Sequence, residues 1–181
     1  MRIAILSDIH DNIWTLAAVL PAIGQAEALV FCGDLCSPFV VNQLAEGYQK
    51  GPIHIVFGNN DGDTFLISKN ASAFEHVQIH GELFRGVLGG KRFAVTHYPS
   101  LANTMDMGTF DVVCYGHDHT YHLSRRGNTL KLNPGPVMGY LPSERRTVPA
   151  SFMIYDAARH EVEGYQLAEG GGAVPYFGEK E

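Results

Sequence analysis

Hydrophobic and polar positions follow two alternating patterns along the first half of the chain. Short and nearly continuous apolar runs predict buried strands at 2–6, 28–31 and 53–57. Between these runs, apolar residues at helical spacing predict helices over 12–23 and 38–45. Asp11 or Asn12 is a suitable N-cap for the first helix. Strands that alternate with helices are typical of right-handed βαβ units, so this half predicts a parallel sheet.

The second half is richer in strands, and three pairs of them read as hairpins. Gly89-Gly90 and Gly127-Asn128 are turn signals between apolar runs, which is the pattern of a β-hairpin. The strands predicted here are 82–88, 91–96, 111–115, 119–125, 129–133, 151–156 and 161–167. Together the two halves predict an α/β fold of two sheets packed face to face, with helices outside.

The length of 181 residues favours one domain, which we expect to span residues 1–168. Gly170-Gly171-Gly172 interrupts the pattern, and no apolar periodicity follows it. Residues 169–181 are therefore expected to form a Gly-rich tail or a segment that docks on a partner.

Composition narrows the classes of partner. Thirteen basic and nineteen acidic residues give a formal net charge of −6, which disfavours long nucleic acid and anionic membranes. No run approaches the ~20 apolar residues that span a bilayer, and no signal peptide is apparent. The three cysteines, an odd and sparse set, argue against a disulfide framework. We therefore expect a cytoplasmic protein.

Side chains that can bind a metal follow five of the predicted strands. One such residue after a strand is more often a helix cap or a packed histidine, but five clusters at five strand ends favour a site. The candidates are Asp8, His10, Asp34, Asn59, His97, His117 and His119. This mixture of carboxylate, imidazole and amide suits Mn, Fe, Zn, Ni or Co better than calcium.

Spacing supports a site for two metals. Asp8 and His10 are two residues apart, as are His117 and His119, and an extended backbone would aim each pair in one direction. Seven ligands are too many for one tetrahedral ion, so we expect two metals that share the carboxylate of Asp34. Glycines at 33, 58 and 116 precede candidate ligands and permit sharp turns or close approach.

The ordered motifs resemble the signature of the calcineurin-like metallophosphoesterases. These are D-x-H at Asp8, G-D at Asp34, G-N-x-D at Asn59, T-H at His97 and G-H-x-H at His117. Asn133-Pro134-Gly135 is similar to a turn in the small single-domain bacterial and archaeal phosphodiesterases of this family. The resemblance implies a four-layer α/β/β/α sandwich with two mixed sheets.

The resemblance also implies a mechanism. One metal would be held by Asp8, His10, Asp34 and His119, and the other by Asp34, Asn59, His97 and His117. Manganese is the metal expected first, with Fe, Zn, Ni or Mg as alternatives. A hydroxide that bridges the metals would attack phosphorus in line with the leaving oxygen. The implied substrate is a small phosphoester, a nucleotide among the candidates, and a diester rather than a monoester.

Three residues depart from the family pattern. Larger relatives carry a histidine, thought to protonate the leaving group, where this chain has Asn60, and Asn cannot act as an acid. Asn60 can still donate a hydrogen bond to phosphate. Tyr98 stands where glycine is usual and would wall the pocket, stack on a base or supply a proton. Asp118 replaces threonine and would orient a histidine. Asn12 either contacts substrate or caps a helix.

Two rival functions remain open on the same fold. A scaffold protein acting through its surface would have a degraded metal site, whereas all seven ligands are present here. A metal-bound phosphate sensor without turnover is the other rival. We also expect a homodimer, because small members of the family often assemble.

Overall fold

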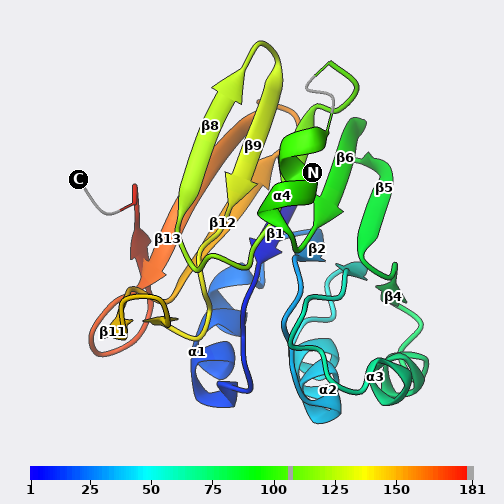
Figure 1. The fold of residues 1–181 in the computed structure, drawn as a ribbon, viewed down its shortest axis with the longest axis vertical. Coiled ribbons are helices and arrows are strands. Elements are labelled where there is room, and N and C mark those ends of the chain that lie inside the picture. The colour runs from blue at the N-terminus through cyan, green and yellow to red at the C-terminus, as the bar shows by residue number, and fades with distance from the viewer. Residues whose placement is uncertain (106–107, 179–181) are drawn as a thin grey trace.

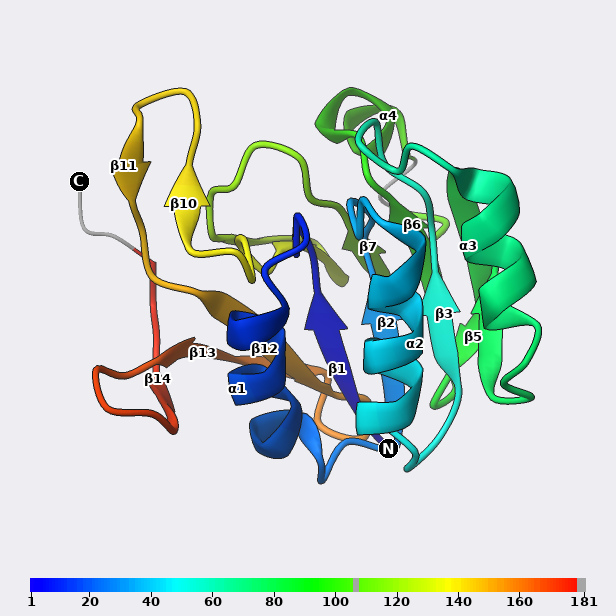
Figure 2. The ribbon, with the colours of Figure 1, turned by 90° about the horizontal axis from the view of Figure 1, so that it is seen from below.

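Two mixed β-sheets form the middle of the structure, and helices cover their outer faces (Figures 1 and 2). The computed structural model describes residues 1–105 and 108–178. The larger sheet has the strand order β14-β13-β12-β1-β2-β3-β4, and the smaller has the order β5-β6-β7-β9-β8. The helices of the described chain are α1 (Ile13–Ile23), α2 (Pro38–Gly47), α3 (Thr64–Ala71) and α4 (Pro99–Thr104).

Strand directions agree with the patterns in both halves of the sequence. β1 to β4 are parallel, whereas β12 runs antiparallel to β1. β6, β7 and β9 are parallel, and the predicted hairpins β5–β6, β8–β9 and β12–β13 are all present. These strands are β1 (Arg2–Leu6), β2 (Ala28–Phe31), β3 (Ile53–Ile55), β4 (Val77–Ile79), β5 (Leu83–Leu88), β6 (Lys91–Thr96), β7 (Val112–Cys114), β8 (His122–Arg126), β9 (Thr129–Asn133), β12 (Ser151–Asp156) and β13 (Glu161–Leu167).

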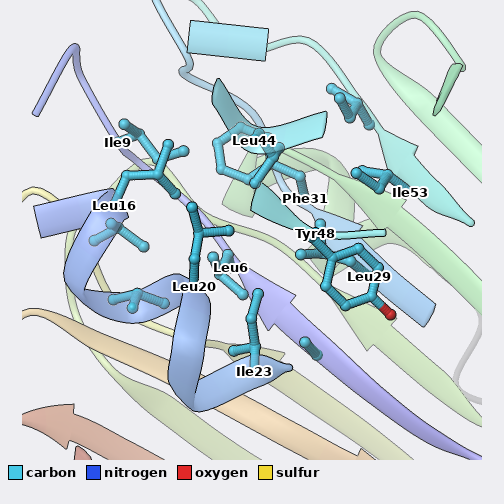
Figure 3. Packing of buried hydrophobic residues seen from close by; sticks show 14 of the residues in the cluster. Leu6, Ile9, Leu16, Leu20, Ile23, Leu29, Phe31, Leu44, Tyr48 and Ile53 are labelled. Atoms are coloured by element: carbon cyan, nitrogen blue, oxygen red, sulfur yellow. The ribbon is translucent and has the colours of Figure 1, made fainter. Parts of the chain in front are cut away.

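The apolar core lies in layers, which explains why the central strands have no polar face. In β1, Ile3 and Ile5 pack between the two sheets, while Ala4 and Leu6 pack against the helices. Figure 3 shows Leu16 and Leu20 of α1 among the side chains of the helix-facing layer. A third cluster joins α4 to the outer face of the smaller sheet. The predicted α/β/β/α order is therefore confirmed, with both faces of each central strand buried.

The structure adds several short elements that the sequence patterns did not predict. These are α3, β4, α4, β10 (Tyr140–Leu141), β11 (Arg146–Thr147) and β14 (Ala173–Pro175). β14 pairs with β13, so part of the segment predicted as a tail, 169–181, is the edge of the larger sheet. The last three residues of that segment lie outside the described residues. No helix within residues 1–105 and 108–178 has the length and apolar content needed to cross a membrane.

Candidate metal centre

Five loops meet where the parallel strands of the two sheets end. In Figure 2 the arrows of β1 and β3 point to this edge. The Asp8 N–H donates to the Gly33 carbonyl at 3.1 Å, and the His10 N–H donates to the Asp34 carbonyl at 3.1 Å. The Gly116 N–H donates to the His97 carbonyl at 3.1 Å. These backbone bonds join the loop after β1 to the loop after β2, and the loop after β6 to the loop after β7.

Asp8 lies against two of the predicted histidine ligands. Its Oδ1 is 3.4 Å from His119 Nε2 and 3.7 Å from His10 Nε2. The two Nε2 atoms are 3.1 Å apart, and the Asp8 side chain is fully buried. Three potential ligand atoms therefore converge at one point within 4.8 Å of one another.

The remaining candidates gather around His97. Its Nε2 is 3.2 Å from Asp34 Oδ2 and 3.1 Å from Asn59 Oδ1. His117 Nδ1 is 2.8 Å from the same Asn59 oxygen. Asp34 Oδ2 is also 3.4 Å from His10 Nε2, so this carboxylate lies between the two groups. All seven residues that the sequence singled out as ligands are thus brought together.

Two backbone carbonyls determine which nitrogen of a histidine faces the centre. His97 Nδ1 lies 2.8 Å from the Cys32 carbonyl, and His119 Nδ1 lies 2.7 Å from the Tyr140 carbonyl. A carbonyl oxygen only accepts, so each Nδ1 carries a hydrogen and each neutral ring presents a lone pair at Nε2. Histidines that bind metals are typically oriented by such a contact.

These lone pairs face other acceptors, which is the arrangement that a cation fits. The Nε2 of neutral His97 faces the oxygens of Asp34 and Asn59, and the Nε2 of His119 faces Asp8. Facing acceptors repel unless a proton or a positive ion lies between them. The carboxylate, imidazole and amide ligands suit a borderline divalent metal.

In this cluster, burial and the contacts between acids and histidines shift the pKa values in opposite directions. Burial raises the pKa of Asp8, but hydrogen bonds with His10 and His119 outweigh it and hold the pKa below its usual value. The pKa of Asp34 is also lowered, since contacts with His97 oppose the effect of burial. Burial lowers the pKa of His97 and His119, but the two carboxylates outweigh it and raise both pKa values. Two buried carboxylates therefore stay anionic at neutral pH.

The backbone of the centre differs from the extended conformation that we predicted for the paired ligands. Asp8 and His10 have φ angles of 55° and 44°, and His117 and His119 have 78° and 54°. These angles lie in the left-handed region, which is costly for residues with a side chain. The extended prediction was wrong because the chain turns sharply here. Each pair converges through two left-handed residues instead.

Close approach explains two of the predicted glycines. A Cβ atom at Gly58 would collide with the side chains of Asp34 and His97. A Cβ atom at Gly116 would collide with Ser7 and approach the carboxylate of Asp8. The glycines therefore leave room for the ligands.

Asn60 and Asp61 support the site from the loop after β3. Asn60 donates to Asp34 twice, from its backbone N–H at 2.8 Å and from Nδ2 at 2.9 Å. The carboxylate of Asp61 accepts from the backbone N–H groups of Gly58, Asp34 and Cys36. Asp61 belongs to the G-N-x-D motif, but its role as a clamp between two loops was not predicted. Only the spacing of the motif signals it.

The other predicted residues have more varied positions. The Asn12 side chain accepts from the Thr15 N–H, as a helix cap does, and its Nδ2 donates to the Met138 carbonyl. The ring centroid of Tyr98 is 5.3 Å from that of His97 and 6.0 Å from that of His117, at the margin of the cluster. Asp118 was expected to orient a histidine, but it accepts from Asn133 and from the Thr120 N–H. The Tyr140 carbonyl orients His119 instead.

Comparison with known proteins places this geometry in a family. The model of the calcineurin-like phosphoesterase superfamily domain matches residues 1–159. The phosphodiesterase MJ0936 of Methanocaldococcus jannaschii is 27% identical over 146 residues, covering 78% of this chain and 87% of its own. The structure of an archaeal phosphodiesterase aligns with a TM-score of 0.79 and 26% identity, covering 92% of this chain and all of the other.

A more distant structure shares the fold. Vps29 from Entamoeba histolytica, solved in complex with Zn²⁺, aligns with a TM-score of 0.65 and 18% identity, covering 97% of this chain and 99% of its own. With the family model matching most of the sequence, this chain belongs to the calcineurin-like phosphoesterase superfamily.

Proposed function

We propose that this protein is a metal-dependent phosphodiesterase that uses two divalent metals. The observation that carries the proposal is the convergence of two buried carboxylates, one amide oxygen and four imidazoles at one edge of the sheets. The phosphodiesterase relatives support the choice of a diester over a monoester. The metals, once bound, would polarise the phosphoryl oxygens and lower the pKa of the attacking water.

The residues divide into two ligand groups that share one carboxylate. Asp8, His10 and His119 would hold one ion, and Asn59, His97 and His117 would hold the other. Asp34 would serve both, because its Oδ2 lies 3.4 Å from His10 Nε2 and 3.2 Å from His97 Nε2. Manganese is our first choice of metal, with Fe, Zn, Ni and Mg as alternatives.

Asn60 limits the leaving group. Its side chain donates to Asp34 and has no acidic proton to give. The P–O bond to the leaving group therefore breaks without a proton from this position, which favours leaving groups that are stable as anions. Tyr98 is the alternative donor: burial, Glu82 and Asp34 raise its pKa, so it remains a protonated phenol at neutral pH.

A comparison of two chromogenic esters tests the proposal. Protein stripped with a chelator should be inactive on bis-p-nitrophenyl phosphate and should recover when Mn²⁺ is added. Its kcat/KM for the diester should exceed that for p-nitrophenyl phosphate. Absence of turnover with Mn²⁺, Fe²⁺, Ni²⁺, Zn²⁺ or Mg²⁺ despite two bound metals would contradict the proposal and favour the scaffold or sensor.

One surface feature favours an interaction role alongside catalysis. Trp14, Phe39 and Phe65 are 78%, 53% and 78% exposed, and each is the second residue of a helix, in α1, α2 and α3. α2 packs against both α1 and α3, so these aromatic residues begin three neighbouring helices. We propose that this row contributes to a homodimer. Trp14→Lys should then shift the molar mass measured by light scattering from dimer to monomer.

We also propose that the protein is located in the cytoplasm. Cys32, Cys36 and Cys114 are all free thiols, which agrees with the reducing conditions of the cytoplasm.

A further inference from the structure

A cavity lies directly beside the metal-binding cluster, on the side of the β10–β11 hairpin. Its volume is about 370 Å³, and His119, one of the proposed ligands, forms part of its lining. This volume falls within the range of pockets that bind small molecules. A group held there would lie one side chain away from the proposed metals.

The hairpin is bonded to the cluster as well as to the cavity. β10 and β11 pair through Tyr140 with Thr147 and through Leu141 with Arg146. The Tyr140 carbonyl accepts from His119 Nδ1 at 2.7 Å, and Val148 lies on the cavity wall just after β11. The wall of the cavity is therefore fixed relative to the catalytic cluster.

The lining has the chemistry that a ring-bearing group needs. Tyr121 and Tyr176 form an aromatic wall, with ring centroids 4.9 Å apart and planes inclined at 70°. Val148 and the prolines Pro136 and Pro149 add apolar surface to the lining. The lining also contains the exposed carboxylate of Glu144, which is paired with Arg146. This pair adds no net charge to the cavity, and the carboxylate can accept hydrogen bonds from hydroxyl groups.

We infer that this cavity binds one ester group of the phosphodiester substrate, and that this group is a nucleoside. A nucleoside offers a flat ring for the aromatic wall and sugar hydroxyls for Glu144. The inference rests on the proposed function and deepens it, because it names the class of the substrate. It also gives the β10–β11 hairpin a role in substrate choice.

Calorimetry tests the cavity without any need for turnover. The Mn²⁺-loaded protein should bind thymidine 5′-phosphate at least tenfold more tightly than inorganic phosphate. Val148→Trp, which fills the cavity from a half-buried position, should abolish this difference. Ala17→Trp is the matched control, since it places the same bulk in a cavity near α1 that His119 does not line.

Glu144→Gln is a second variant that should keep the fold, because Glu144 is exposed and the change adds no bulk. It should weaken binding of thymidine 5′-phosphate by a few-fold, with no effect on inorganic phosphate. The inference is overturned if wild-type protein binds the two ligands equally, or if neither Val148→Trp nor Glu144→Gln alters the difference.

Kinetics separate this inference from the proposed function. Thymidine 5′-(p-nitrophenyl) phosphate and methyl p-nitrophenyl phosphate share a leaving group, and wild-type kcat/KM should favour the first by at least tenfold. Val148→Trp should remove that preference, so that the ratio of the two kcat/KM values falls to about one. Equal rates for wild-type protein would overturn the nucleoside cavity but not the phosphodiesterase. Tight binding of thymidine 5′-phosphate without turnover of either ester would contradict the phosphodiesterase but not the cavity.

Discussion

Histidines gather at two places in this molecule, and the groups that surround them differ. At the edge of the sheets, the imidazoles of His10, His97 and His119 face the buried carboxylates of Asp8 and Asp34, and His117 lies against His97. Between the sheets, His54 Nδ1 lies 3.0 Å from His80 Nε2, and both rings pack against Phe84. In the described part of the chain, neither His54 nor His80 pairs with a carboxylate.

The surroundings change the protonation of the rings in opposite directions. Next to Asp8 and Asp34, the pKa values of His119 and His97 are raised despite burial. Burial, together with His80, lowers the pKa of His54 to about 4, and burial also lowers that of His80. His54 and His119 are similarly buried, at 8% and 5% exposed, so burial alone does not separate a proposed ligand from a packing residue. The distinguishing feature is the carboxylate that faces His119 and that, among the described residues, is missing at His54.

The largest effect should come from removing a shared or central ligand. Asp34→Ala and His117→Ala should each lower kcat/KM for bis-p-nitrophenyl phosphate by more than about 100-fold, since even the loss of a residue that orients a ligand costs 10- to 100-fold. The fold should persist, because the side chains of Asp34 and His117 are not part of the packed hydrophobic core. Circular dichroism and thermal unfolding would verify it.

His54→Phe is the matched control for these two variants. It replaces a ring of the packing pair and should keep the wild-type rate. A similar loss of activity in His54→Phe would remove the distinction between the two groups of histidines. Wild-type rates in both ligand variants would show that the site is misplaced.

The second largest effect should come from metal binding, which should involve the histidines at the sheet edge but not His54 and His80. Mn²⁺ at about 100 times its dissociation constant should stabilise the protein by roughly 3 kcal/mol, because it binds only the folded state. Chelation should reverse the gain, and Asp8→Asn should abolish it. Thermal unfolding with and without Mn²⁺ measures this effect. In an NMR titration with diamagnetic Zn²⁺, the ring signals of His97 and His119 should shift and those of His54 and His80 should not.

The gathering of the proposed ligands was predictable from the sequence because each follows a strand at a shared sheet edge. Parallel strands in one half and hairpins in the other determine the layers, so Asp8, Asp34 and His97 had to meet once the topology was right. The two-residue spacing, by contrast, suggested extended backbone. The left-handed φ angles of Asp8 and His119 arise from tertiary packing of the loops, which local sequence does not encode.

Other parts of the site have no signature in the sequence. The carbonyls of Cys32 and Tyr140 orient two histidines, and a carbonyl is common to every residue type. β10 and β11 have two residues each, too few for a periodic pattern. β14 was not predicted, because three glycines precede it and interrupt the strand pattern. It forms by pairing with β13.

Acidic pH should weaken the fold through His54. Its pKa is about 4 in the folded state, against about 6.5 for an ordinary histidine, so the unfolded chain binds the extra proton between these values. This contribution to stability is complete above pH 6.5 and is lost as the pH falls towards 4. The free energy of unfolding should drop by about 2 kcal/mol from this group by pH 5.

Urea denaturation at pH 7 and pH 5 measures this loss. His54→Phe lacks the titrating ring and should lose correspondingly less stability between the two pH values. An equal loss in the wild type and in His54→Phe would contradict the assignment of the acid sensitivity to this pair.

The smallest effect should come from Asn60→His, which tests whether the proposed lack of an acid matters. A histidine there would offer a proton to the leaving oxygen, so the rate should rise by a few-fold, up to about tenfold, for diesters with poor leaving groups. With p-nitrophenolate, which needs no proton, the rate should stay level. The measurement is the slope of log kcat/KM against leaving-group pKa, which should become shallower.

Asn60→Ala is the control: it removes the 2.9 Å hydrogen bond to Asp34, so it should lower all rates by a similar factor and leave the slope unchanged. An unchanged slope in Asn60→His would mean that the leaving group receives its proton elsewhere, with Tyr98→Phe as the variant that should then steepen it.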